Sequence, residues 1–127
     1  MKQIIMTNDA PAAIGPYSQG IKAGGFIYLS GQIPLDPKTG EIVAGGIEQQ
    51  TAQVLDNISA LLAAEGAAPE DIIKTTVFLK NIGDFAAMND VYANYFGTEG
   101  CPVRSTIEVA ALPKGALVEI EAVAFMG

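Results

Sequence analysis

The sequence predicts a single α/β (α+β) domain over residues 1–127, with one sheet of about six strands and two helices on one face of that sheet. Three observations favour this architecture. Short runs of β-branched and aromatic residues are separated by turn residues, and two segments carry apolar residues at helical spacing. Hydrophobic residues make up 50% of the 127 residues, which is enough for one buried core.

The N-terminal half predicts three strands and one helix. Short strands are expected at Ile4–Met6 and Ile21–Ala23, and a longer strand begins at Gly25 in "GFIYLSGQIP". The turn "DPKTG" follows this strand. A helix is then expected from Ile47 until Gly66 stops it. Its apolar side chains recur at helical spacing, at Val54, Leu55, Ile58, Leu61 and Leu62.

The C-terminal half predicts a strand, a second helix and two further strands. In "DIIKTTVFLK" the alternation points Ile73, Val77 and Leu79 towards the same side. Asp84 is placed to cap the second helix, and Gly97 ends it. The apolar stripe of this helix consists of Phe85, Met88, Val91, Tyr92, Tyr95 and Phe96. The last two strands flank a Pro-Lys-Gly turn in "RSTIEVAALPKGALVEIEA", and we expect them to form an antiparallel hairpin.

The sheet face away from the helices is expected to be strongly apolar. It would carry Phe26, Tyr28, Phe78, Val123 and Phe125. This surface is too large to be left in water, so either loops of the chain or other copies of the chain must cover it. We expect a homo-oligomer.

Composition excludes several classes of protein. A net charge of −7 makes a nucleic-acid partner unexpected, because phosphate binding needs a dense basic surface. The absence of His removes the catalytic triads and the commonest metal ligand, and one Cys cannot form an intrachain disulfide. We therefore expect no metal, and we interpret Cys101 as an incidental thiol. No apolar run is long enough for a membrane span and no secretory signal is visible, so a cytoplasmic protein without a membrane partner is expected.

Charged residues in the last two strands are the main candidates for chemistry. Arg104 and Thr106 share one face of their strand, and Glu119 and Glu121 share a face of the next. The expected hairpin brings these four side chains together on the face away from the helices. One interpretation is a cross-strand ion pair. The other is a site in which the Arg fork binds a carboxylate and a partly desolvated Glu transfers a proton.

A loop near the N-terminus offers an aromatic candidate. "APAAIGPYSQG" is punctuated by Pro and Gly and holds Tyr17 as its only aromatic residue. Tyr17 either pins this loop to the core or belongs to a site.

Four blocks together resemble the RidA family, also called YjgF, of imine and enamine deaminases. They are "APAAIGPYSQG", "SGQIPLDPKTGE", "KTTVFLKNIGDFAAMNDVYANYF" and "RSTIEVAALPKGALVEIEAVA", in the order of the family and over essentially the whole chain. The resemblance implies a fold like that of the small trimeric chorismate mutases. In it the sheets of three subunits form a central barrel, and the active sites lie between subunits. It also implies hydrolysis of 2-iminobutanoate and 2-iminopropanoate, which pyridoxal-phosphate-dependent dehydratases release, to the 2-keto acid and ammonia without a cofactor.

The resemblance assigns roles by position. Arg104 would bind the substrate carboxylate, Glu119 would activate water and help to protonate the leaving nitrogen, and Tyr17 would close the cleft. The residues that would line it are Ser30, Gly31, through its backbone, and Asn89 in "MNDVY". Thr106 would offer its backbone N–H to the substrate. Many relatives carry Cys at that position, and because a backbone donor survives the exchange we expect imine hydrolysis to survive too.

Two other functions remain as alternatives. The same cleft could serve a non-enzymatic protein that binds small carboxylates or regulates other proteins. An endoribonuclease or translation inhibitor is the third possibility, and the net charge of −7 and the lack of His argue against it.

Overall fold

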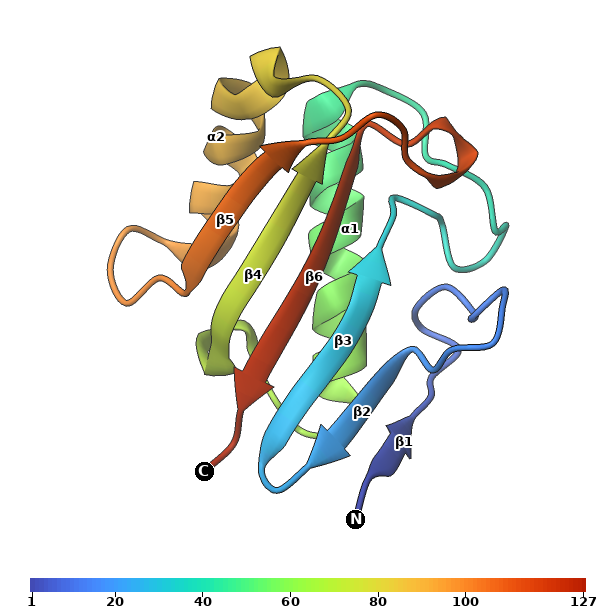
Figure 1. Ribbon diagram of the computed structural model, residues 1–127, viewed down its shortest axis with the longest axis vertical. Coiled ribbons are helices and arrows are strands. Elements are labelled where there is room, and N and C mark those ends of the chain that lie inside the picture. The colour runs from blue at the N-terminus through green and yellow to red at the C-terminus, as the bar shows by residue number, and fades with distance from the viewer.

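A mixed sheet of six strands, in the order β1-β2-β3-β6-β4-β5, forms the frame of the molecule (Figure 1). The computed structural model describes residues 1–127. The strands are β1 (Gln3–Ile5), β2 (Gly20–Ala23), β3 (Phe26–Gln32), β4 (Ile72–Leu79), β5 (Val103–Glu108) and β6 (Val118–Phe125). Short 3₁₀ turns lie at η1 (Pro69–Asp71), η2 (Ile82–Asp84) and η3 (Pro113–Gly115). The predicted fold class is confirmed.

Two helices cover one face of this sheet, as predicted. They are α1 (Ile47–Ala63) and α2 (Phe85–Phe96), and both lie behind the sheet in the view of Figure 1. The apolar stripe of α1 is buried against the sheet, together with alternate residues of β3, β4 and β6. Asp84 stands at the N-cap of α2, but its side chain makes no capping hydrogen bond. Gly97 follows α2 with a φ of 77°, a value that favours glycine. Neither helix has the length and apolar character that a bilayer crossing requires.

The predicted hairpin of the last two strands is wrong. β5 is an edge strand that pairs in parallel with β4, whereas β6 lies between β3 and β4 and is antiparallel to both. The connection over residues 109–117 includes η3 and crosses the end of β4, so it is not a tight turn. In these pairings Val77 of β4 is opposite Thr106 of β5, and Phe78 of β4 is opposite Glu119 of β6.

Ile73 also departs from its expected position. The pairing of β4 with β6 shifts between Ile72 and Lys74, which leaves Ile73 at a bulge. Ile73 is therefore 44% exposed, and Ile72 fills the core instead, at 4% exposed. Beyond the bulge, Val77 and Leu79 are buried as predicted.

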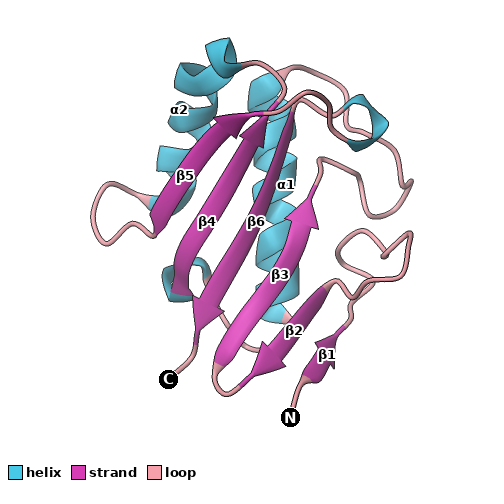
Figure 2. Ribbon diagram, in the orientation of Figure 1, coloured by secondary structure: helices cyan, strands magenta, loops and turns pink.

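The second face of the sheet is uncovered and apolar. Phe26, Tyr28 and Phe125 project from it and remain exposed, and the rings of Phe26 and Phe125 lie 4.8 Å apart between centroids. Figure 2 shows all the helices and most of the loops behind or around this face rather than over it. The loops of the same chain therefore do not bury this surface. We call it the open face below.

Candidate functional site

Arg104 extends from β5 over α2, on the helix side of the sheet. Its register partner in β4 is Thr75, whose side chain is buried against the helices. Arg104 Nη1 donates a 2.8 Å hydrogen bond to Asn89 Oδ1. Its Cζ lies 4.7 Å from the ring centroid of Tyr92 and 5.5 Å from that of Phe85. Since Phe85, Asn89 and Tyr92 are spaced by four and three residues, one face of α2 supplies all three contacts.

The charge of Arg104 has no counter-ion in the chain. Its partners are a neutral amide and two aromatic rings, and no carboxylate forms an ion pair with it, although the chain carries 14 Asp and Glu. The guanidinium faces a cleft of about 440 Å³. Its lining residues are Asn89, Tyr92, Ala93, Gly97, Cys101, Pro102 and Arg104. An unpaired guanidinium in a cleft is suited to a carboxylate ligand.

Glu119 projects from the open face, beside an irregularity in β3. The pairing of β3 with β6 shifts between Leu29 and Gln32, and Gly31 lies within this shift. A Cβ on Gly31 would lie 2.9 Å from Cδ of Glu119 and would collide with its carboxylate oxygen. Glycine is therefore required for the carboxyl group of Glu119 to pack against the backbone of β3.

Burial raises the pKa of Glu119, and the like charge of Glu121 raises it further. The two carboxylates border a second cleft of about 510 Å³. It is lined by Ile14, Tyr17, Ser30, Gly31, Ile33, Pro113, Glu119 and Glu121. A carboxyl group with a raised pKa keeps its proton to higher pH than an exposed one, and this favours a role as general acid or base.

Tyr17 lines the Glu119 cleft and does not pin its loop to the core. Its ring is 51% exposed, and its hydroxyl accepts a 3.3 Å hydrogen bond from the Ile14 N–H. Gln19, which no sequence signal distinguishes, holds the loop instead. Its buried side chain donates to the carbonyls of Thr7 and Pro11 and accepts from the Thr7 N–H. Ser30 ties the loop to β3 by donating to the carbonyl of Ser18 at 2.6 Å.

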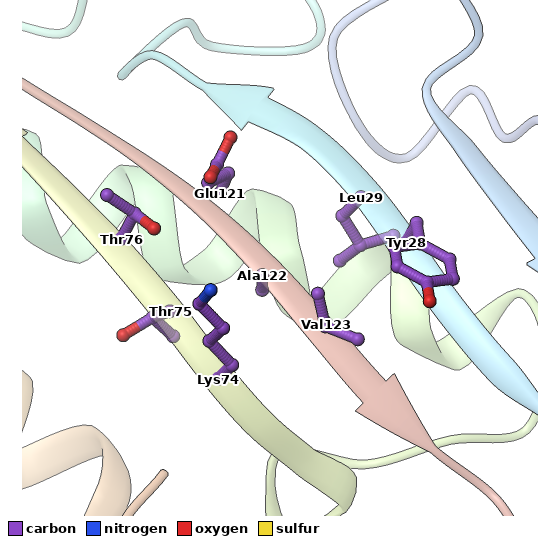
Figure 3. A pocket seen from close by; sticks show the side chains of 8 residues that line it. All are labelled: Tyr28, Leu29, Lys74, Thr75, Thr76, Glu121, Ala122 and Val123. Carbon is purple, nitrogen blue, oxygen red and sulfur yellow. The ribbon is translucent and has the colours of Figure 1, made fainter. Parts of the chain in front are cut away.

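A third, shallow cleft of about 140 Å³ lies along β6 (Figure 3). It is lined by Tyr28, Leu29, Lys74, Thr75, Thr76, Glu121, Ala122 and Val123. Glu121 borders this cleft as well as the Glu119 cleft. No group of three or more His, Cys, Asp or Glu side chains gathers where it could hold a metal ion.

The expected cluster of Arg104, Thr106, Glu119 and Glu121 is not formed. Thr106 is opposite buried Val77 and Arg104 is opposite buried Thr75, so both lie on the helix side. Glu119 and Glu121 lie on the open face, opposite Phe78 and Thr76. The error follows from the hairpin: with β4 between β5 and β6, face assignments made for adjacent strands do not apply. The predicted cross-strand ion pair is absent for the same reason.

The candidate residues thus form two separate groups. Tyr17, Ser30, Gly31 and Glu119 share one cleft, and Arg104 and Asn89 share the other. Thr106 lies beside the second group in β5, and its Oγ1 is buried without a hydrogen-bond partner. Tyr92 belongs to the apolar stripe of its helix, and no sequence signal distinguishes its contact with Arg104. Cys101 is exposed and lines the Arg104 cleft.

Comparison with known proteins identifies whole-length relatives. The family model described as "Endoribonuclease L-PSP" matches residues 7–126. A RutC family protein of Pyrococcus horikoshii is 59% identical, covering 98% of each chain. The 2-iminobutanoate/2-iminopropanoate deaminase of Capra hircus is 48% identical, covering 100% of this chain and 92% of its own. The crystal structure of E. coli TdcF with bound serine matches with a TM-score of 0.92 and 45% identity, covering 98% of this chain and 99% of that one.

Proposed function

This chain belongs to the YjgF/RidA family, and on that premise we propose that it hydrolyses 2-imino acids, among them 2-iminobutanoate and 2-iminopropanoate, to the 2-keto acid and ammonia. The observation that carries the proposal is the single arginine of the chain, Arg104, which faces a cleft with no carboxylate to neutralise it. Glu119, with its raised pKa, supplies the proton-transfer group that imine hydrolysis needs.

The proposed reaction uses one carboxylate clamp and one acid–base group. Arg104 holds the substrate carboxylate through two parallel N–H donors, and the backbone N–H of Thr106 adds a third. Glu119 orients a water molecule and accepts a proton as the oxygen adds to C2 of the protonated imine. The same proton passes from Glu119 to the nitrogen, and the C–N bond then breaks. Ammonia leaves as the C2 carbonyl forms, and Glu119 accepts the proton of the C2 hydroxyl and releases it to solvent. Orientation accounts for much of the effect, since imines hydrolyse readily in water.

The proposal includes a homotrimer with the reaction site between neighbouring copies. In one chain the sheet backbone separates Arg104 from Glu119, and a substrate of four carbons cannot contact both. A site made of the Arg104 cleft of one copy and the Glu119 cleft of its neighbour brings them together. The open face supports this arrangement, because its exposed Phe26, Tyr28 and Phe125 need a partner surface.

The experiment is an assay of 2-keto acid release from iminobutanoate generated freshly in the cuvette. Wild-type protein should accelerate release over buffer, and Arg104→Ala should lose at least about 100-fold in kcat/KM, the scale of a lost charged clamp. Lys38→Ala is the matched control, because it also removes a cation but from an exposed turn. Folded wild-type protein without acceleration, or full activity of Arg104→Ala, would contradict the proposal.

A non-enzymatic carboxylate-binding protein is the second candidate, and the serine-bound structure of E. coli TdcF is the observation that favours it. Calorimetry with 2-oxobutanoate beside the imine assay separates the two, because binding without turnover supports only the second. The net charge of −7 and the single arginine argue against an RNA-cleaving function.

A further inference from the structure

The contact between Tyr92 and Arg104 lies at the end of a chain of interactions that begins in β4. The Tyr92 hydroxyl and Thr75 Oγ1 form a buried hydrogen bond of 2.7 Å. Thr75 is the residue of β4 that is directly opposite Arg104 in β5. The ring of Tyr92 therefore lies 4.7 Å from Arg104 Cζ and is also tethered to the strand beside it.

The surroundings of Tyr92 leave its ring little freedom to move. The side chain is 6% exposed, and its ring packs on Phe96 at 4.5 Å between centroids. Burial raises the pKa of its hydroxyl, so Tyr92 stays neutral and does not act as a counter-ion for Arg104. Its interaction with the guanidinium is one of ring and cation, which orients the cation without neutralising it.

The guanidinium of Arg104 is held through Nη1, and it faces the cleft. Asn89 accepts a hydrogen bond from Nη1, and the rings of Tyr92 and Phe85 lie beside the guanidinium. A planar group fixed in this way presents its remaining N–H donors in one direction. A carboxylate then binds without the cost of ordering a flexible side chain.

We propose that Tyr92 is a positioning residue for Arg104: its hydrogen bond to Thr75 fixes the ring, and the ring fixes the plane of the guanidinium that receives the substrate carboxylate. This inference rests on the proposed function for the identity of the substrate. It assigns to Tyr92 an effect on carboxylate binding more than on the chemical step, because its hydroxyl is hydrogen-bonded to Thr75 and its ring contacts the guanidinium.

Three variants separate the contribution of the Tyr92 ring from that of its hydrogen bond to Thr75. Tyr92→Leu removes the ring, Tyr92→Phe keeps the ring and removes the tether, and Thr75→Val leaves the hydroxyl without its partner. Tyr92→Leu should raise KM for the imine and Kd for 2-oxobutanoate about tenfold, with kcat changed much less. Tyr92→Phe and Thr75→Val should each raise them about two- to threefold, so that the conservative variant restores most of the binding.

Tyr95 provides a matched control on the same helix. It is also a tyrosine of α2, its hydroxyl is hydrogen-bonded to Ser59, and burial raises its pKa as well. It does not contact Arg104. Tyr95→Leu and Tyr95→Phe thus make the same substitutions as the two Tyr92 variants, with a similar loss of stability. They should leave Kd for 2-oxobutanoate unchanged.

A double-mutant cycle with Arg104→Lys completes the test. If Tyr92 acts through the guanidinium, Tyr92→Leu should have little further effect on Kd once Arg104 is Lys, because a lysine has no plane to orient. Equal effects of the Tyr92 and Tyr95 substitutions, or additive effects of Tyr92→Leu and Arg104→Lys, would overturn the inference. If Tyr92→Leu fails to fold, the Kd values of Tyr92→Phe and Thr75→Val, compared with that of Tyr95→Phe, still test the inference.

The outcome for wild-type protein separates this inference from the proposed function. Wild type that binds 2-oxobutanoate without hydrolysing imines contradicts the deaminase proposal, and the series of Kd values still decides the role of Tyr92. Wild type that neither binds nor hydrolyses overturns both.

Discussion

Arg104 and Glu119 lie on opposite faces of one sheet, with strand β4 between the strands that carry them. Arg104 contacts α2 on the covered face, and Glu119 packs against Gly31 on the open face. Each residue has its own cleft and its own supporting contacts. A reaction that needs both therefore needs two copies of the chain, and this requirement can be tested directly.

Mixing two inactive variants should restore activity. Arg104→Ala and Glu119→Gln should each be inactive alone, whereas subunits mixed in equal amounts and allowed to exchange should regain about one quarter of the wild-type activity. The reason is statistical: a site is intact when a Glu119→Gln copy supplies the arginine and an Arg104→Ala copy supplies the glutamate.

The measurement is the initial rate of 2-keto acid release after refolding the mixture from denaturant. Mixing before and after refolding provides the control, because only exchanged subunits can complement. If each site used Arg104 and Glu119 from the same copy, no mixture would exceed the activity of the separate variants.

Gly31→Ala should displace the carboxyl group of Glu119 and leave the fold intact. The added Cβ would stand 2.9 Å from Glu119 Cδ, and the flexible end of a glutamate can move away at little cost in stability. We expect kcat to fall about 100-fold with little change in Kd for 2-oxobutanoate. Gly83→Ala is the control, because a Cβ there meets nothing within 4 Å. A Gly31→Ala protein with normal kcat would show that the close packing of Glu119 is not needed.

Thr106→Val should retain activity and raise stability. Thr106 Oγ1 is buried without a hydrogen-bond partner, so replacing the hydroxyl with a methyl group of similar shape removes a desolvation cost. We expect a gain of about 1 kcal/mol in the free energy of unfolding, measured by urea denaturation, because a buried unpaired polar group costs on that order. The substrate contact proposed for this position uses the backbone N–H, which valine keeps. A large loss of kcat/KM in Thr106→Val but not in Thr106→Ser would assign the contact to the hydroxyl instead.

The fold could be predicted from the sequence because its signals are local. The apolar period of α1 and the alternation of Val77 and Leu79 in β4 each depend on neighbouring residues, and both predict the observed burial. Only Ile73 departs from this alternation, because of the bulge beside it. The partner of a strand is a non-local property, and chain order alone does not determine it. The segment between Glu108 and Val118 reads equally well as the turn of a hairpin or as a crossing over β4.

That one error in strand order changed the face of every candidate residue in β5. Tyr17, Gly31 and Glu119 could be assigned through the resemblance, which does not depend on pairing, and they do share a cleft. Tyr92 and Gln19 could not be found in this way. A tyrosine in an apolar stripe and a glutamine in a loop become informative only when Arg104 and Thr7 lie beside them.

The charge of Glu119 should reduce stability at neutral pH. Because folding raises the pKa of this carboxyl group, the folded chain holds its proton more tightly than the unfolded chain does. Protonated Glu119 therefore contributes its full stabilisation of the folded chain below the ordinary carboxyl pKa. That contribution is lost as pH rises through the raised pKa of the folded state. Glu119→Gln should have a higher Tm than wild type at about pH 8 and lose this advantage near pH 4.

Glu121→Gln should move the pH dependence that Glu119 imposes on activity. Removing the like charge of Glu121 lowers the pKa of Glu119, so the limb of the kcat profile that reports Glu119 should shift to lower pH. An unshifted limb would assign it to another group.

Alkylation of Cys101 should report occupation of the Arg104 cleft without any turnover. Cys101 is the only thiol of the chain, it is exposed, and it lines the same cleft as Arg104. A carboxylate held on Arg104 would occupy the cleft that Cys101 lines, so saturating 2-oxobutanoate should slow alkylation by iodoacetamide several-fold. Anionic iodoacetate should also react faster, relative to iodoacetamide, than it does with free cysteine, because an unpaired guanidinium attracts it. Arg104→Ala should abolish both effects and Lys38→Ala neither. Protection that persists in Arg104→Ala would place the ligand elsewhere.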